Sequence, residues 1–401
     1  MNSKPIRAIK KTSDNTISKL TYSALAIPAL VQPSILNAAV APQEHSVNVR
    51  LSQYKEVEMP SERVGFGSLE RYAIEILQFT LVAPLKNDKA LNTYVAYETM
   101  SGASPLTSRL NDSGQTVVTM SGASIEEKRV DANIALTKYT KRSTLTGAIA
   151  ISNENDYQSV ALSLDGSIEN NNKHLTLLGS LSVSVDELSP TNPGLNTNKL
   201  NALGESKHSF SGYFGFNRIL NQYSTLQVGV GLTQISGYLS DPYRITDIRP
   251  DVRNQTTLNM QYRTFSSSMN SAVHFNYRYY QDDWDILAHT LEASIWKDIS
   301  FSSFSLLLSP NVRYYWQHQA KFYDLDAAST NAYRSSDFRL SAYGSINIGV
   351  DLKINFTDTA FTLGANQYFS SENFGLTGAQ DYETPSLVNF SVMSFGMEYR
   401  F

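Results

Sequence analysis

The sequence predicts an all-β fold: a single transmembrane antiparallel up-and-down β-barrel of about sixteen strands, with periplasmic termini and long extracellular loops. Three observations predict it. Long segments alternate strictly between apolar and polar residues, short and long connections alternate along the chain, and the last strand ends on an aromatic residue. Such alternation places one apolar and one polar face on each strand, which is the arrangement of outer-membrane barrels.

The composition narrows the fold class and removes several functions. Charged residues make up 17% of the 401 residues, aromatic residues 11%, and Tyr (23) far outnumbers Trp (3). Tyr suits a membrane interface, where one side of the ring is apolar and one edge is wet. A net charge of -4 gives no support for nucleic-acid binding. The absence of cysteine excludes disulfides, thiolate metal sites, iron–sulfur ligation and C-x-x-C-H haem attachment.

The amino-terminal segment has the pattern of a secretory signal peptide. Basic residues, among them Lys4, Arg7 and Lys19, precede an apolar run over 20–36 and small residues over 37–41. This order predicts an exported chain with a signal peptide at 1–41, cleaved within 36–41, and a barrel over 42–401. Pro28, Pro33 and Pro42 depart from the usual pattern, and a disordered tail is the alternative. The mature chain has no stretch of about 18 apolar residues, so no transmembrane helix is expected.

Period-2 segments recur from residue 46 to the end of the chain. In the clearest one, residues 340–355, Ile346, Ile348 and Val350 share one face, and Asn347 and Asp351 share the other. Sixteen alternating residues extend roughly 50 Å, enough for a tilted membrane span. Strands are expected near 46–55, 70–83, 90–100, 126–140, 143–155, 156–169, 173–185, 207–219, 222–238, 254–266, 269–281, 285–298, 301–317, 337–352, 358–371 and 388–401.

The connections between these strands alternate in length. Those after even-numbered strands are short, such as 86–89, 141–142 and 170–172, whereas most of those after odd-numbered strands are long, such as 56–69, 101–125 and 186–206. An up-and-down barrel has this pattern because its turns are tight at the periplasmic end and long outside. A β-propeller would repeat every four strands, and the sequence has no such repeat.

The final strand carries the expected assembly signal. Phe395, Met397, Tyr399 and Phe401 alternate with small or polar residues, and Phe401 ends the chain. A terminal Phe on an aromatic-rich alternating strand resembles the sorting signal that the barrel assembly machinery reads. Outer-membrane lipid and this machinery are therefore expected partners.

Residues 98–190 carry the most distinctive motifs. ETMSGASP at 98–105, TMSGAS at 119–124, NENDYQSVALSLDGS at 153–167 and DELSPTNP at 186–193, with FNYRYYQDDWDILAHTLE at 275–292, resemble an uncharacterised Gram-negative outer-membrane family, domain of unknown function number thirty-five-seventy. The resemblance covers essentially the whole mature chain. It implies a large outer-membrane barrel with no assigned activity. Family members are often encoded beside a small lipoprotein, a thioredoxin-like protein and a flavin transferase, which implies an envelope redox system.

Ionisable residues on the expected inner faces are the candidates for a lumen lining. In an aqueous channel they would tune ion selectivity, and in a closed barrel they would pair into ladders that fill the interior. A barrel of about sixteen strands is too wide for side chains alone to fill, so a pore or a plug is expected. Mixed signs favour weak selectivity. The candidates are Arg129, Asp131, Asp165, Arg278, Glu292, Arg313, Asp351, Lys353, Glu398 and Arg400.

Two SGAS stretches bracket the longest early loop. They could form a constriction or plug, or they could simply permit tight turns at the barrel rim. Neither matches the G-x-S-x-G nucleophile elbow. The loop or plug candidates are Ser101, Gly102, Ser104, Ser121, Gly122 and Ser124.

Other clusters offer weaker signals. Asp282, Asp283 and Asp285 could bind Ca²⁺, but a solvated turn is the more usual role of such a cluster. No cofactor is expected, and the six His residues show no paired ligand spacing. A lipid-modifying enzyme would need a His–Ser pair, but His208 and Ser209 are neighbours and should point to opposite faces.

The sequence thus predicts a non-enzymatic, porin-like channel in the Gram-negative outer membrane. The main alternative is a barrel scaffold or sheath that docks a periplasmic redox protein or small lipoprotein. Lipid-modifying chemistry is the third hypothesis.

Overall fold

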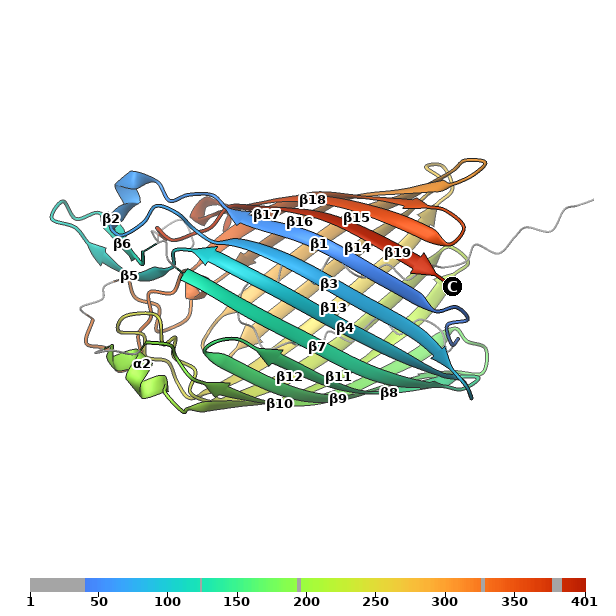
Figure 1. Cartoon of the computed structure of the whole chain (residues 1–401), viewed down its shortest axis with the longest axis horizontal. Helices are drawn as coiled ribbons and strands as arrows, with labels where there is room; N and C mark the ends of the chain where they lie inside the picture. Colours follow the sequence, from blue (N-terminus) through green and yellow to red (C-terminus); the bar gives the residue numbers. More distant parts are fainter. Residues whose placement is uncertain (1–39, 123–124, 193–195, 326–328, 377–383) are drawn as a thin grey trace, which may run out of the picture.

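The computed structural model describes residues 40–122, 125–192, 196–325, 329–376 and 384–401. The expected signal peptide falls almost wholly outside these residues. Within them the chain forms a closed antiparallel barrel of sixteen strands (Figure 1). Its strands are β1 (Ser46–Glu56), β3 (Ala73–Leu85), β4 (Lys89–Gly102), β7 (Ile125–Tyr139), β8 (Ser143–Asn153), β9 (Tyr157–Glu169), β10 (Leu175–Leu188), β11 (Ser206–Asn221), β12 (Ser224–Gly237), β13 (Val252–Ser266), β14 (Ser271–Asp282), β15 (Leu287–Ser300), β16 (Ser305–Gln317), β17 (Tyr343–Asn355), β18 (Thr359–Ser371) and β19 (Phe390–Arg400).

The predicted fold class is confirmed, and each predicted strand corresponds to one barrel strand. The barrel closes where β1 pairs with β19, with Ser46 opposite Arg400 and Glu56 opposite Phe390. At the same edge the backbones of His45 and Phe401 exchange two hydrogen bonds of 3.1 and 3.0 Å. The start of β1 and the end of β19 therefore both lie at the rim with the short turns.

Two predictions of local structure are wrong. The segment 101–125 was expected to be a loop, but it contains β5 (Pro105–Leu110) and β6 (Thr116–Met120), which form a three-stranded sheet with β2 (Val64–Phe66). The strand expected from residue 337 begins only at Tyr343, because Phe338–Leu340 forms the 3-10 helix η2. Leu340 occupies a position in the sequence that would continue the apolar face of β17, but it is buried among loop residues such as Trp284 and Phe322.

The outer wall of the barrel is apolar, as the alternation predicts. Leu162, Phe210 and Leu232 are 52%, 56% and 59% exposed in the isolated chain, while their sequence neighbours face inward. Four phenylalanine rings form a cluster near the rim with the short turns: Phe301 contacts Phe304, which contacts Phe356, and the ring of Phe361 lies 6.2 Å from that of Phe356. Apolar walls with aromatic girdles are what a bilayer requires of a β-barrel.

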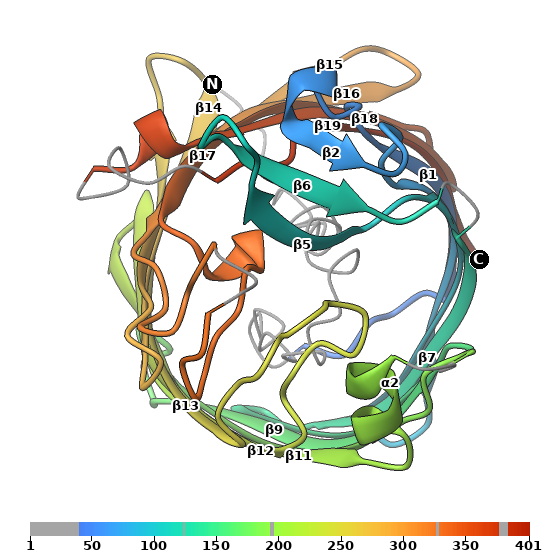
Figure 2. The same ribbon diagram turned by 90° about the vertical axis from the view of Figure 1, so that its left-hand side faces the viewer.

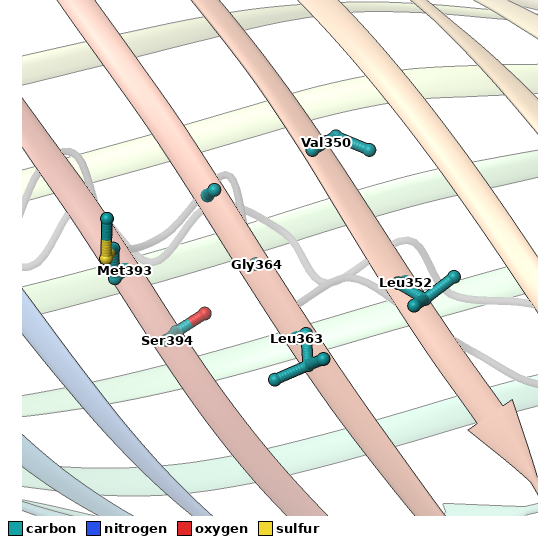
Figure 3. A pocket seen from close by; sticks show the side chains of 7 residues that line it. Val350, Leu352, Leu363, Gly364, Met393 and Ser394 are labelled. Carbon is teal, nitrogen blue, oxygen red and sulfur yellow. The ribbon is translucent and has the colours of Figure 1, made fainter.

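The outer wall also has a shallow depression of about 250 Å³ (Figure 3). Ala365 lies between Val350 and Met393 on neighbouring strands, so its short side chain leaves the gap. The lining is almost wholly apolar and lies on the outer face of the barrel, so it suits an apolar group such as an acyl chain rather than a polar ligand.

In the described part of the chain, no helix is long and apolar enough to cross a membrane.

The long connections gather at the other end of the barrel. Figure 2 shows the β2–β6–β5 sheet and the loops β12–β13 and β16–β17 lying across this end, with the short helix α2 (Thr197–Ala202) beside them. The mouth of the barrel is therefore partly covered by folded loops.

Candidate functional site: the lumen and its mouth

The sequence-predicted lumen residues all lie on the inward-facing positions of their strands. Each alternates with apolar residues of the outer wall; Asp131, for instance, follows Val130, which is 42% exposed. Several form ion pairs along the wall. Lys353 contacts Glu398 at 3.0 Å, Glu398 contacts Arg400 at 3.2 Å, and Arg129 contacts Asp131 at 2.7 Å. At these places on the wall, charges pair between strands or along one strand.

Other charges on the inner wall are held by neutral groups. Asn276 donates a hydrogen bond of 3.2 Å to Glu292, and Arg263 donates one of 3.2 Å to Gln261. Ser163 donates to one carboxylate oxygen of Asp165 at 3.3 Å, while the other oxygen makes no hydrogen bond within the described chain. The inner wall therefore presents charge that the protein itself does not fully neutralise.

One stretch of the inner wall is made flat by glycine. The hydroxyl of Tyr213 on β11 lies against Gly215 and against Gly229 on β12, where an added Cβ would come within 2.0 Å of the hydroxyl oxygen. Because no side chain stands at Gly229, the tyrosine ring can lie along the wall instead of projecting into the lumen. The Tyr213 ring therefore takes up less of the cross-section of the lumen at this level.

The two SGAS stretches meet at the base of the β5–β6 hairpin. The backbone N–H of Ser104 donates to the hydroxyl of Ser121 at 3.0 Å, and the N–H of Ser121 donates to the carbonyl of Ser104 at 2.9 Å. Gly102 adopts a φ of 122°, and an added Cβ there would lie 2.3 Å from the carbonyl oxygen of Arg71. The pair therefore forms the neck of the hairpin; Ser124 lies outside the described residues.

Six charged residues form a cluster at the mouth that the sequence reasoning did not find. They belong to the loops β12–β13 and β16–β17, and together they make three carboxylates and three guanidinium groups. We name them the mouth cluster: Asp241, Arg244, Asp247, Arg249, Asp337 and Arg339. The signal that could have found them is the alternation of Asp and Arg in DPYRITDIRPD at 241–251, which recurs in DFR at 337–339.

Asp337 is the centre of the mouth cluster. Its side chain is fully buried, and it lies 3.0 Å from Arg249 and 3.3 Å from Arg244. It also caps η2, because its carboxylate accepts a hydrogen bond of 3.0 Å from the backbone N–H of Arg339. Burial would raise the pKa of Asp337, but Arg244, Arg339 and Arg249 hold that pKa well below its usual range. The carboxylate is therefore ionised, and arginines of the β12–β13 and β16–β17 loops compensate its charge.

The cluster ties several loops into one cap. The backbones of Ile248 and Arg334 exchange two hydrogen bonds of 2.9 Å, which join the two loops directly. Ile245 donates a backbone hydrogen bond of 3.0 Å to Leu106 in β5, and the side-chain amide of Asn198 in α2 donates one of 2.6 Å to the carbonyl of Arg244. The cap is thus held by polar contacts between loops that are far apart in sequence.

Two of the three aspartates considered for Ca²⁺ have structural partners, whereas Asp285 is exposed in the turn. Asp282 accepts two hydrogen bonds of 2.6 and 2.8 Å from Arg253, and Asp283 accepts one of 2.7 Å from Asn254. Their carboxylates stabilise the β14–β15 turn and its link to β13. His208 is exposed on the outer side, whereas Ser209 bonds Ser184 at 2.7 Å. The two point to opposite faces, so they cannot act as a catalytic pair.

Sequence comparison identifies one family. A model of the family described as "Protein of unknown function (DUF3570)" matches residues 17–384. No curated protein sequence matches the chain.

Structure comparison returns outer-membrane barrels of low sequence identity. The chain is similar to "Bacterial polysaccharide outer membrane secretin" (14% identity, TM-score 0.47, covering 88% of this chain and 98% of that one). It is also similar to CdiB from Acinetobacter baumannii (8%, 0.49, 90% and 60%) and to Pseudomonas aeruginosa OccD3 (OpdP) (9%, 0.41, 91% and 93%). The chain thus spans about 60% of the length of CdiB.

Proposed function

The chain belongs to the family described as Protein of unknown function (DUF3570), and from this starting point we propose that it is a passive outer-membrane channel for small polar solutes. Its apolar wall would contact outer-membrane lipid, and its last strand would be read by the barrel assembly machinery. The mouth cluster would hold a loop cap that narrows the entrance. No chemical step is assigned to the protein.

One observation carries this proposal: a closed ring of sixteen strands has a charged and polar inner wall. A ring of eight strands is just wide enough for side chains to fill, whereas rings of sixteen enclose water. Buried charges without water would be costly, so the incompletely paired Asp165 and Arg263 favour a hydrated interior. The flat wall at Tyr213 acts in the same direction.

Planar-bilayer conductance of the refolded mature chain tests the proposal. We expect discrete conductance steps, with ion selectivity obtained from the reversal potential in a salt gradient. Heat-modifiable migration on a gel provides the control that the sample is folded. If the folded wild-type barrel and a folded variant in which the mouth cluster is disrupted both fail to conduct, the channel proposal is refuted.

The scaffold hypothesis makes a different prediction. A barrel that docks a periplasmic redox protein or small lipoprotein would co-purify with that partner in stoichiometric amount from native membranes. Absence of conductance in the planar bilayer, together with such a partner, would favour the scaffold over the channel.

A further inference from the structure

The charges of the lumen are separated by sign around the ring. Neighbouring strands β4 and β7 turn Glu98, Arg129 and Asp131 inward, so this wall carries one excess negative charge at that level. At the corresponding level, strands β14, β15 and β16 turn Arg278, Glu292 and Arg313 inward, so that wall carries one excess positive charge there.

These two walls face each other. In the ring of sixteen, β14 is eight places from β4, and β15 is eight places from β7, whichever way one counts. Strands half a ring apart lie on opposite sides of a closed barrel. The charges also lie at similar depths: Glu98 and Asp131 are nine and eight residues from the ends of their strands at the short-turn rim, and Arg278 is seven.

The separation continues along the wall on each side. On the acidic side, β9 adds Asp165, which has no cationic partner among the described residues. On the basic side, β13 adds Arg263, whose guanidinium bonds only the neutral Gln261 within the described chain. Strands β1 and β17–β19 carry inward charges that largely balance, such as Lys353 with Glu398.

From this arrangement we propose that the lumen is a transverse dipole that favours zwitterionic solutes, such as amino acids and short peptides, over neutral solutes of the same size. A zwitterion can turn its ammonium group toward Glu98 and Asp131 and its carboxylate toward Arg278. Monovalent ions of either sign gain on one wall what they lose on the other, so weak ion selectivity accompanies this preference. The inference deepens the proposed channel function and rests on it.

The size of the preference is limited by water in the lumen. Water screens charge pairs that it contacts, so each pair contributes little; a threefold ratio corresponds to about 0.65 kcal/mol. We therefore expect a zwitterion to permeate about threefold faster than a neutral solute of the same size.

Liposome swelling with glycylglycine and with the uncharged N-acetylglycinamide measures this ratio. The key variant is the double substitution Glu98→Gln with Arg278→Gln, which leaves the net charge unchanged and removes the excess charge of both walls. The matched control is Lys353→Gln with Glu398→Gln, which also removes one charge of each sign but does so within the balanced sector. We expect the ratio to fall toward one in the first variant and to stay at the wild-type value in the second.

The outcomes separate the inference from the function beneath it. If wild-type vesicles swell but the ratio is one, or is the same in the double variant, the dipole proposal is wrong and the channel stands. If folded wild-type barrels produce neither swelling nor conductance, the channel itself is refuted, and this inference with it. Should the double variant fail to assemble, each single substitution must lower the ratio part of the way, and Arg278→Lys must retain it.

Discussion

Replacing Asp337 by Asn should open the cap at the mouth of the barrel. Asn has nearly the same size and can still cap η2, so the substitution removes the charge and little else. In the wild type the Asp337 carboxylate contacts Arg244, Arg249 and Arg339 and, with Asp241 and Asp247, balances their three positive charges. In the variant three guanidinium groups share only Asp241 and Asp247, and one positive charge is left uncompensated in a buried site.

The expected magnitude follows from the burial. Removing one partner of a buried, hydrogen-bonded ion pair costs about 3–5 kcal/mol, which corresponds to a shift of roughly a hundredfold to several thousandfold toward undocked loops. The cost falls on the cap and not on the barrel, because the cluster joins loops to one another. The barrel should therefore assemble normally while its mouth widens.

Two measurements test this reasoning together. Single-channel conductance should rise or become noisier, and trypsin should cleave the β12–β13 loop after Arg244, which is followed by Ile245, far faster than in the wild type. Asp112→Asn is the control, since Asp112 is an exposed carboxylate in the turn of the β5–β6 hairpin. Unchanged conductance and unchanged trypsin cleavage in a folded Asp337→Asn barrel would refute the claim that this cluster holds the cap.

Three further predictions concern other parts of the molecule. Deleting Phe401 removes the hydrogen bonds to His45 and should lower the yield of heat-modifiable barrel several-fold, whereas Phe401→Tyr should assemble normally; normal yield from the deletion would contradict this. Gly102→Ala should destabilise the hairpin neck by about 1–3 kcal/mol, because φ is 122° there; equal proteolysis of the 105–120 hairpin in variant and wild type would argue against it. Burial, only partly offset by Arg129, raises the pKa of Glu154 in the β8–β9 turn to about 7. A carboxyl whose pKa is raised on folding contributes stability at low pH that is lost as pH rises through that value. Glu154→Gln should flatten the wild-type decline in thermal stability up to about pH 7; parallel pH profiles would count against this assignment.

The sequence indicated the barrel well because its main constraint is local. A strand in a membrane must present apolar side chains to lipid at every second position, and this period is visible in segments such as 343–355 without knowledge of the neighbouring strands. The alternation of short and long connections follows from the up-and-down topology. The inward placement of Arg313 and Asp351 follows from the same parity.

Folded loops escaped prediction because their structure depends on contacts distant in sequence. The β5–β6 hairpin carries no long alternation, and its base is held by the pairing of Ser104 with Ser121. The burial of Asp337 depends on arginines contributed by a loop some ninety positions earlier. Leu340 fits the period of its strand, but packing against Trp284 draws it into the cap.

The sequence by itself therefore determined the class of fold, the faces of the strands and the identity of the lumen charges, because parity along a strand is a property of consecutive residues. Only the tertiary structure decided which charges stand opposite one another. Glu98 and Arg278 come to opposite walls because ring closure places β4 and β14 half a circumference apart. The tertiary structure also decided that Asp and Arg residues from two loops form ion pairs, since ion pairing depends on distance in space and not along the chain.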